Sequence, residues 1–452
     1  MAELSRPALA AVAERIVGQA RAGEQVEAYV GWARDTAVRV YDREVESLSS
    51  AESEGVGIRV VLGDRQGFAY AGSLDEAMLA DTLNEARDNA GFATPDEAVG
   101  LATPDGVAPP VLDLWRDDLE ALPAADKVAL ALELEERARA ADSRIRQVES
   151  ANYGDAMTEV AIASSTGVRA SHRRTGCHLS AWVIAGQGDD TQTGGGYSVG
   201  RSAADLSVDE AATDAVERAT RMLGSRKARS ARLPVVFDRR VTSTVLAVLA
   251  GTFSGEAVLK GRSLFAERLG EEVAGAAIVL VDDPTNPDAF GASVYDAEGL
   301  ACRRNVLIDA GVVSRFVYDS YSARRAGTTS TGSAVRAGFK SGPGVGCRAV
   351  SLQPGTRSTD EILSGVGHGL FVQTISGVHS GVNPVSGDFS VGAEGMMIRD
   401  GKLAEPVREI TIASTLQRML REVIEIGGDL EWLPGVAAGL TLAVDGISLS
   451  GE

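Results

Sequence analysis

The feature that most constrains the fold is a recurring series of short, strand-like runs separated by Gly and Asp-Arg breaks. One series occupies residues 27–34, 37–48, 56–62 and 67–71, and a second occupies residues 158–163, 168–172, 178–185 and 197–201. Short apolar or alternating runs bounded by turn residues are typical of antiparallel hairpins. We therefore expect two antiparallel meanders in the first half of the chain.

Segments with apolar residues at spacings of three and four predict the helices. They lie at residues 9–20, 74–90, 125–141, 208–223, 241–260 and 414–426, and Ser5 and Pro7 are start signals for the first. Between the last two, short strands alternate with Gly-rich turns. The pattern predicts an α+β fold: an N-terminal domain of antiparallel sheet with helices at residues 1–225, and a β-dominated C-terminal domain at residues 226–452.

Length and charge narrow the class of protein. A chain of 452 residues is too long for one ordinary core. A net charge of −19 would repel a phosphate backbone, so we expect no nucleic-acid partner. We interpret the one basic cluster as a solvated linker; it comprises Arg221, Arg226, Lys227, Arg229 and Arg232.

The sequence shows no pattern typical of a membrane-spanning segment or of a disulfide-bonded fold. No apolar run approaches the roughly 18 residues of a membrane span, and the first residues do not form a signal peptide. The three cysteines are odd in number and far apart. We therefore expect a cytoplasmic protein without a membrane partner.

Three long segments carry a family resemblance. They are GVGIRVVLGDRQGFAYAGSLDEAMLADTLNEA from Gly55, SGEAVLKGRSLFAERLGEEVA from Ser254 with VDDPTNPDAFGASVYDAEGLACRRNVLIDAGVV after it, and SGVNPVSGDFSVGAEGMMIRDGKL from Ser380. Together they resemble the TldD/PmbA family, once named modulators of DNA gyrase. The likeness spans nearly the whole chain.

The resemblance implies a zinc site that this chain has lost. The TldD-type subunit resembles a zinc peptidase with an H-E-A-V-G-H element on a helix and a late Cys ligand. Here the matching stretch is GEAVLK: Gly255 and Lys260 stand at the histidine positions, Glu256 remains, and no Cys follows Cys347. A zinc peptidase needs three ligands and an open water position. We expect no catalytic residue, no metal ligand and no cofactor in this chain.

This departure matches the PmbA or TldE branch, which resembles the metal-free partner of TldD. The implied function is the non-metal subunit of a peptidase complex that acts on unfolded or extended peptides, with a TldD-like zinc-bearing subunit as partner. Two alternatives stay open: a homodimeric peptide-binding module without catalysis, and an independent metal-free hydrolase. Glu256 and Lys260 are four residues apart, so an ordinary ion pair competes with a relic site.

The run Gly381 to Ser390, GVNPVSGDFS, is the most individual local feature. By resemblance it borders the channel that holds an extended peptide. The candidate channel residues are Asn383, Gly387, Asp388 and Ser390. Asn-Pro and Ser-Gly-Asp also favour tight turns whose side chains cap nearby backbone, so a purely structural turn stays open as well.

Four other patterns have an ordinary interpretation that we favour. Cys177 and His178 are neighbours and cannot aim both side chains at one ion from a regular strand. Ser198 sits in a G-x-S-x-G match that falls inside a predicted strand. The glycines at residues 194–196 indicate a turn or loop rather than a phosphate site. We interpret a group of four acidic residues as part of a solvated loop rather than as a Mg²⁺ or Ca²⁺ site; they are Asp282, Asp283, Asp296 and Glu298.

Overall fold

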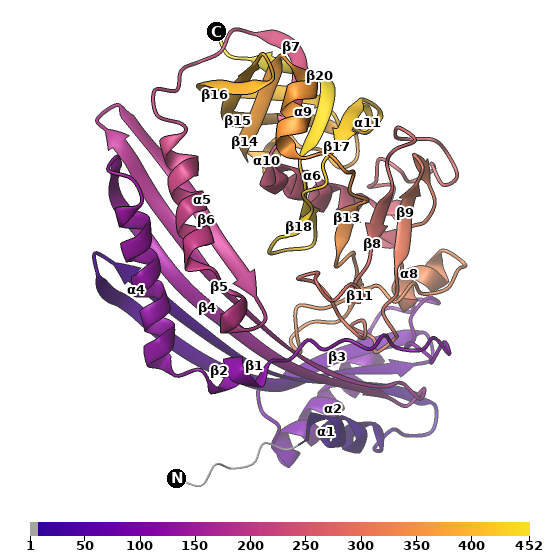
Figure 1. Ribbon diagram of the computed structural model, residues 1–452. Helices are drawn as coiled ribbons and strands as arrows, with labels where there is room; N and C mark the ends of the chain where they lie inside the picture. Colours follow the sequence, from indigo (N-terminus) through magenta and orange to yellow (C-terminus); the bar gives the residue numbers. More distant parts are fainter. Residues whose placement is uncertain (1–7) are drawn as a thin grey trace.

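The first half of the chain forms one six-stranded antiparallel sheet in the order β3-β2-β1-β4-β5-β6 (Figure 1). The computed structural model describes residues 8–452, so Ser5 and Pro7 lie outside the described part. The strands are β1 Glu24–Tyr41, β2 Glu44–Leu62, β3 Arg65–Ala71, β4 Ile145–Ser164, β5 Arg169–Gln187 and β6 Asp190–Gly200. Because β1 pairs with β4, the two predicted meanders are halves of a single sheet.

The strands are longer than the sequence pattern predicted. The predicted break at residues 35–36 was wrong, because Asp35 pairs with Ala51 on one side and Ala156 on the other. The predicted run at residues 37–48 instead straddles a hairpin turn at Asp42 and Arg43, whose φ angles are 49° and 66°. Two positive φ angles give the backbone twist of a two-residue hairpin. Likewise, β5 joins two runs that were predicted separately.

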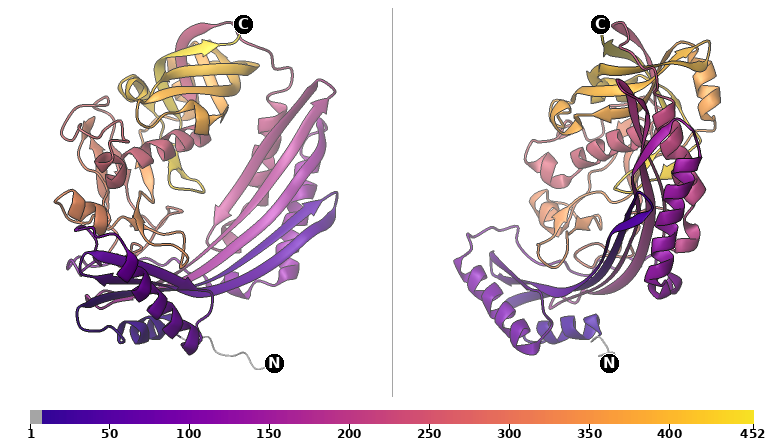
Figure 2. Two further views of the ribbon diagram at one scale, coloured as in Figure 1. Left: turned by 180° about the vertical axis from the view of Figure 1, so that it is seen from behind. Right: turned by 90° about the vertical axis from the view of Figure 1, so that its left-hand side faces the viewer.

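Helices cover one face of this sheet, and the C-terminal half lies over the other, inner face (Figures 1 and 2). These helices are α1 Leu9–Val17, α2 Glu76–Phe92, α4 Ala124–Ala140 and α5 Val208–Thr220, with the short α3 Asp117–Ala121 and the 3₁₀ turn Ala203–Asp205 beside them. Their apolar faces and the strands share one contiguous core. The four predicted N-terminal helices are confirmed to within a few residues.

The glycine run at residues 194–196 belongs to β6, so the predicted turn or loop was wrong. A Cβ atom at Gly194 or Gly196 would lie 2.2 or 2.1 Å from a backbone oxygen of α5. Gly195 faces the opposite side, beneath the ring of Trp182. These glycines lack side chains because a helix packs directly on the strand, a use of glycine that local pattern does not distinguish from a turn.

The C-terminal half is built on a six-stranded sheet, β16-β15-β14-β7-β20-β17, which an extra β16–β20 pairing closes on itself. A four-stranded sheet, β10-β9-β8-β13, and two small ribbons, β11-β12 and β18-β19, lie beside it. The strands are β7 Ala231–Phe237, β8 Leu280–Asp282, β9 Asn305–Asp309, β10 Val312–Val313, β11 Ala334–Val335, β12 Gly344–Val345, β13 Val350–Leu352, β14 Gly369–Ser376, β15 Asp388–Arg399, β16 Lys402–Thr415, β17 Val423–Ile426, β18 Glu431–Trp432, β19 Ala438–Gly439 and β20 Leu442–Ser450. This confirms the α+β fold with a β-dominated C-terminal half.

The two helices predicted in this half are shorter in the structure, and three further short helices were not predicted. They are α6 Arg239–Thr252, α7 Gly255–Leu259, α8 Ser320–Arg325, α9 Thr359–Val366, α10 Val378–Gly381 and α11 Leu416–Arg421. The predicted helix at 241–260 breaks at Phe253 and Ser254, where the backbone pairs with Val317 instead. The predicted helix at 414–426 ends at Arg421, because the β-branched residues after it pair with β20 as β17.

The two halves have separate main cores, one spanning Leu9 to Ala219 and the other Leu233 to Leu449. We keep the division at residues 225 and 226 as a proposal on this basis. Among residues 8–452, no helix has both the length and the apolar character that crossing a membrane requires.

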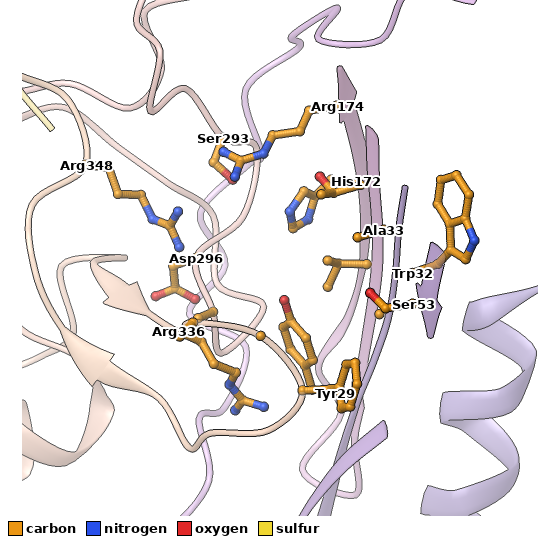
Figure 3. Close-up of a pocket in the computed structure, with 17 residues that line it drawn as sticks. Tyr29, Trp32, Ala33, Ser53, His172, Arg174, Ser293, Asp296, Arg336 and Arg348 are labelled. Carbon is orange, nitrogen blue, oxygen red and sulfur yellow. The ribbon is translucent and has the colours of Figure 1, made fainter. Parts of the chain in front are cut away.

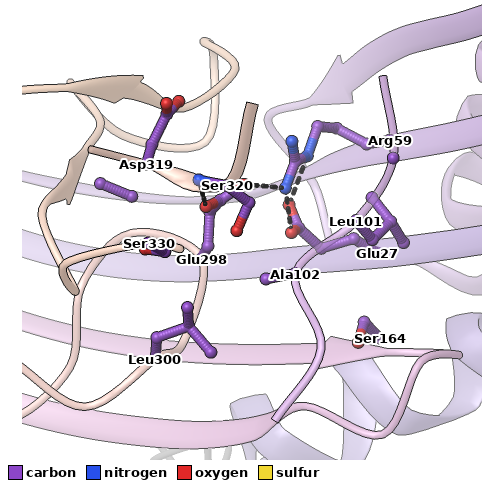
Figure 4. Close-up of polar contacts among 12 residues, drawn as sticks. Glu27, Arg59, Leu101, Ala102, Ser164, Glu298, Leu300, Asp319, Ser320 and Ser330 are labelled. Atoms are coloured by element: carbon purple, nitrogen blue, oxygen red, sulfur yellow. Dashed lines mark hydrogen bonds and ion pairs between the residues drawn. The ribbon is translucent and has the colours of Figure 1, made fainter. Parts of the chain in front are cut away.

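A buried ion network fastens one end of the N-terminal sheet to the C-terminal half (Figure 4). Arg59 Nε donates to Glu27 Oε1 at 2.8 Å, and Arg59 Nη2 lies 3.3 Å from Glu298 Oε1. Arg336 Nη2 lies 2.7 Å from Glu27 Oε1. Burial opposes ionisation of Glu27, but the charges of Arg59 and Arg336 outweigh it and lower the pKa of this carboxyl. The sheet and the C-terminal half are thus joined by charges withdrawn from water.

A second contact joins the halves at the far side of the sheet. Arg218 of α5 donates to the Gln373 carbonyl at 2.8 Å and pairs with Asp238 at 3.1 Å. Arg240 donates to the Gly195 carbonyl at 2.6 Å and pairs with Asp214. Arg201 adds a further contact, donating to the Ala289 carbonyl at 2.9 Å, and cavities lie between the sheet and the C-terminal half.

Candidate functional site

The sequence motif at residues 255–260 forms the single helical turn α7, Gly255–Leu259, with Lys260 as its C-cap residue. Lys260 and Glu256 make the predicted i,i+4 ion pair, with side chains 54% and 51% exposed. Exposed pairs of this kind contribute about 0.3–0.5 kcal/mol. The ion-pair interpretation is confirmed, and Glu256 is bonded to the residue that ends its own helical turn.

The first histidine position of the family motif has no room for a side chain. Gly255 donates its N–H to the Val317 carbonyl at 2.8 Å. A Cβ at Gly255 would lie 2.2 Å from Cδ1 of Tyr318 and 2.9 Å from the Val317 oxygen. The aromatic ring of Tyr318 thus occupies the space into which a ligand side chain would extend.

The residues at these positions do not fit a zinc ion. Gly255 supplies no donor, and Lys260 places a cation where a second histidine would stand. Within residues 8–452, no three His, Cys, Asp or Glu side chains gather closely enough to hold a metal. Cys347 is buried, with its thiol directed at the Ala250 carbonyl, and burial raises its pKa well above the ordinary value.

The loop at residues 383–390 is a self-satisfied turn. Asn383 Oδ1 accepts the N–H groups of Val385 and Ser386 at 2.9 and 3.2 Å, and Ser386 Oγ donates to Asp388 Oδ2 at 2.7 Å. Gly387 has a φ of 84° and abuts Gln417. The structural role of the loop is confirmed, whereas peptide contact by Asn383, Gly387, Asp388 or Ser390 stays a prediction.

This loop lies beside the segment that follows α7, because Leu264 donates its N–H to the Pro384 carbonyl at 3.1 Å. The structure therefore brings the degenerate motif and the candidate channel loop close together, although more than a hundred residues of chain separate them.

Three adjoining cavities follow the inner face of the N-terminal sheet, and we call them together the inner groove. The first has a volume of about 250 Å³ and lies between β1, β2, β4 and β5 and loops of the C-terminal half. It shares Thr158 and Arg174 with a second cavity of about 250 Å³. The second shares Ala156, Gly176 and Phe290 with a third of about 550 Å³. The groove thus runs along the sheet.

The first cavity is lined by three guanidinium groups, from Arg174, Arg336 and Arg348, and we call it the arginine cavity (Figure 3). The side chain of Arg336 is 0% exposed, and its guanidinium carbon lies 4.5 Å from the centre of the Tyr29 ring. One nitrogen of Arg336 pairs with Glu27, while its Nε and Nη1 have no partner within residues 8–452. Arg348 donates from Nη2 to the Ala334 carbonyl at 3.0 Å, and its Nε has no partner in that range.

The other titratable groups of the arginine cavity do not cancel this positive charge. Burial, with the charges of Arg348 and Arg174, lowers the pKa of His172 to about 4, so this imidazole is neutral near pH 7. Asp296 accepts backbone N–H groups from Glu298, Leu300 and Ala334 at 2.9–3.1 Å. Burial and the neighbouring Glu298 raise the pKa of Asp296 to about 7. The cavity is cationic in a strongly acidic chain.

The acids that were predicted to form a solvated loop are instead mostly buried. Asp282 is 1%, Asp296 0% and Glu298 1% exposed. Asp282 accepts the N–H groups of Arg348 and Ala349 at 2.9 and 2.8 Å, while Glu298 is bonded to Arg59 and to the Ser320 N–H. Each carboxylate thus serves its own backbone or arginine donors, and the four do not converge on one ion.

Ser198 does not lie on a nucleophile elbow. It is within β6, 5% exposed, and its Oγ accepts the N–H of Ser207 at 3.0 Å just before α5 begins. His178 pairs with Gly154 and Val199 across the sheet, apart from the arginine cavity that His172 lines. The structural interpretation of the G-x-S-x-G match is confirmed.

Sequence reasoning missed the three arginines of the cavity. Arg174 comes from β5, whereas Arg336 and Arg348 come from loops more than 160 residues later. The available signal was the apolar alternation of β5, which assigns Arg174 to one face and Arg173 to the other. The pattern does not indicate which distant segments pack against the face that carries Arg174.

Known proteins match this chain along nearly its whole length. PmbA/TldA metallopeptidase domain 1 matches residues 26–90, the central domain residues 117–223, and the C-terminal domain residues 230–451. The metalloprotease PmbA of Escherichia coli O157:H7 is 28% identical, over 93% of this chain and 91% of that protein. A metalloprotease PmbA homolog of Haemophilus influenzae is 26% identical, over 96% and 93%.

Solved structures show the same fold. A Thermotoga maritima protein described as a modulator of a DNA gyrase superposes with a TM-score of 0.89 at 23% identity, covering 97% of this chain and 99% of that one. TldE from Thermococcus kodakarensis superposes with a TM-score of 0.86 at 22% identity, covering 98% and 99%.

Proposed function

Because the chain belongs to the TldD/PmbA family of metallopeptidases, we propose that it is the metal-free, TldE-like subunit of a peptidase complex. A TldD-like partner supplies the zinc, and this subunit forms a wall of the chamber that holds an unfolded or extended peptide. The proposal retains a cytoplasmic location. The observation that carries it is Gly255, packed against Tyr318 at the position of a metal ligand.

The chemistry of α7 supports this division of labour. A catalytic zinc ion needs three donors, an open position for water and a base near that water. In this chain the two histidine positions hold a glycine without space and a lysine whose charge repels a metal ion. Glu256 has the identity of a base but is engaged by Lys260 at the surface.

The inner groove supports a role in holding peptide. Its floor carries small side chains, among them Ala156, Thr158 and Gly176, so an extended chain can approach the sheet closely. Its opposite wall comes from loops of the C-terminal half, the region that also carries α7. A peptide lying in the groove would contact both halves of this subunit.

The test mixes this protein with a TldD-like chain that carries an intact H-E-x-x-x-H element and a late cysteine, and follows cleavage of an unstructured fluorogenic peptide. We expect neither chain alone to cleave, the mixture to cleave, and a chelator to abolish cleavage. Cleavage by this chain alone, at the rate of the mixture and with chelator present, would instead establish an independent hydrolase. Peptide binding by a homodimer, with no cleavage in any mixture, would establish a binding module.

A further inference from the structure

The arginine cavity holds more N–H donors than the protein's own acceptors use. Within residues 8–452 the side chain of Arg174 makes no hydrogen bond or ion pair, and three buried guanidinium nitrogens, Nε and Nη1 of Arg336 and Nε of Arg348, have no hydrogen-bond partner. Guanidinium groups match carboxylates in a two-pronged geometry. An uncompensated buried donor costs about 1–3 kcal/mol, so a ligand that satisfies several of them binds favourably.

We propose that the arginine cavity binds the free C-terminal carboxylate of a peptide lying in the inner groove. The inference rests on the proposed function for the identity of the ligand as a peptide, whereas the carboxylate site stands on the arginines themselves. Arg174 and Arg348 receive the carboxylate from the sheet and from the C-terminal half, and Arg336 supplies charge from beneath (Figure 3).

The shape of the groove indicates that the arginine cavity receives the end of a peptide and not its middle. Beyond the arginine cavity, Arg336 pairs with buried Glu27, and the network of Glu27, Arg59 and Glu298 packs the two halves together. In the other direction the cavity continues through Thr158 and Arg174 into the rest of the groove. A chain entering along the sheet therefore ends at the arginines.

The size and lining of the cavity favour a carboxylate-bearing terminal residue. A volume of about 250 Å³ is below the roughly 300–1,000 Å³ of sites that enclose whole small ligands, so it accommodates only the end of a longer one. Tyr29, Val160 and Phe339 give it apolar walls beside the guanidinium groups. Such walls suit the side chain of a terminal residue, whereas a free phosphate ion has no apolar part to place there.

The carboxylates nearby leave the site cationic. Glu27 is shared between Arg59 and Arg336, and Asp296 is held by three backbone N–H groups with its pKa raised to about 7. Asp282, behind Arg348, is buried, and burial raises its pKa to about 6. None of these groups is paired with Arg174, which makes Arg174 the arginine that can be replaced without breaking an internal ion pair.

The experiment measures binding of two unstructured labelled peptides to the isolated chain, identical except that one ends in a free carboxylate and the other in an amide. We expect the acid to bind at least about tenfold more tightly, since a charge-assisted hydrogen bond contributes more than a neutral one. Arg174→Gln should remove this preference. Arg173→Gln is the matched control, because Arg173 is adjacent on β5 but exposed on the opposite face, over Trp115.

Equal binding of acid and amide to the unmodified protein would overturn the proposal, and this comparison needs no variant to fold. Loss of the preference in Arg173→Gln as well as Arg174→Gln would also overturn it. Displacement of the acid peptide by inorganic phosphate at equal concentration would assign the cavity to a free anion instead. Acid preference without cleavage in the two-chain mixture would defeat the proposed function and leave this site standing, whereas cleavage without acid preference would do the reverse.

Discussion

The α7 turn and the arginine cavity differ in how their charged side chains are satisfied. On α7, Glu256 and Lys260 neutralise each other in water, and Tyr318 fills the space beside Gly255. In the arginine cavity, buried guanidinium groups retain donors without partners. The motif that sequence identifies is closed to metal chemistry, while the site that sequence does not identify is open to a ligand.

Breaking the buried network beside the cavity should have the largest effect on stability. Glu27→Gln leaves Arg59 and Arg336 with one fewer counter-charge, and removing one partner of a buried ion pair costs about 3–5 kcal/mol. Urea unfolding at pH 7 measures this loss. Since the pKa of Glu27 is below the ordinary 4.5, its contribution is present above that pH and is lost as pH falls through the lower folded-state pKa. A loss no larger than that of the exposed control Glu256→Gln would contradict a structural role for the network.

Asp282, which supports Arg348 from behind, should make stability depend on pH in the opposite sense. Burial raises the pKa of Asp282 to about 6, because it favours the protonated carboxyl in the folded protein. The stability that this protonation contributes is fully present below the unfolded pKa of 3.8 and is lost as pH rises through 6. Asp282→Asn keeps an oxygen for the Arg348 and Ala349 N–H groups but does not titrate. We expect the variant to gain on the wild type by up to about 3 kcal/mol between pH 4 and pH 7.

Urea unfolding across this pH range, with the surface variant Asp309→Asn as the control for loss of one carboxylate, checks the Asp282 prediction. A difference between Asp282→Asn and wild type that does not change with pH would show that Asp282 does not titrate in the folded state.

Gly255→Ala should destabilise the protein by about 1–3 kcal/mol, the usual cost of overpacking, because its Cβ would collide with Tyr318 and the Val317 oxygen. Gly251→Ala is the matched control: no atom lies within 4 Å of its Cβ, and Gly251 is within α6. There the substitution should be neutral or stabilise by up to about 1 kcal/mol. If Gly255→Ala is as stable as wild type, Tyr318 can move and the position has room for a side chain.

Glu256→Gln should leave the activity of the two-chain mixture within about twofold, since this carboxylate does not take the proton of a metal-bound water. The same substitution in the partner's intact motif should lower activity by about a hundredfold or more, the usual size for a general base. A hundredfold loss from Glu256→Gln here would place this subunit in the chemistry.

The zinc content of the isolated chain should be the same with and without a chelator. Elemental analysis of the isolated chain after gel filtration should find no stoichiometric zinc, with or without prior chelation, because α7 offers a single carboxylate that is already paired. One zinc per chain that is removed by chelator together with peptide cleavage would show that donors elsewhere assemble a site.

Several features of this protein could be predicted from the sequence because they are local. Short apolar runs between turn residues predicted most strands of the N-terminal sheet, although not their full lengths, and apolar spacings of three and four predicted the four N-terminal helices. The spacing of Glu256 and Lys260 predicted their ion pair. The motif positions Gly255 and Lys260 revealed the missing ligands without any coordinates. Such features depend on side-chain identity and on neighbours within about four residues, which the chain order states directly.

Tertiary structure alone decided where the strands pair and what faces them. The pairing of β1 with β4 merged two predicted meanders, and the pairing of β17 with β20 converted the end of a predicted helix into a strand. It also decided that Gly194 and Gly196 contact a helix, that Tyr318 occupies the space beside Gly255, and that Arg174 meets Arg336 and Arg348. These outcomes depend on contacts between residues that are far apart in the chain. The free energy of such contacts comes from the burial of apolar surface and from the pairing of buried charges. A local sequence pattern does not specify which distant segment a residue will contact.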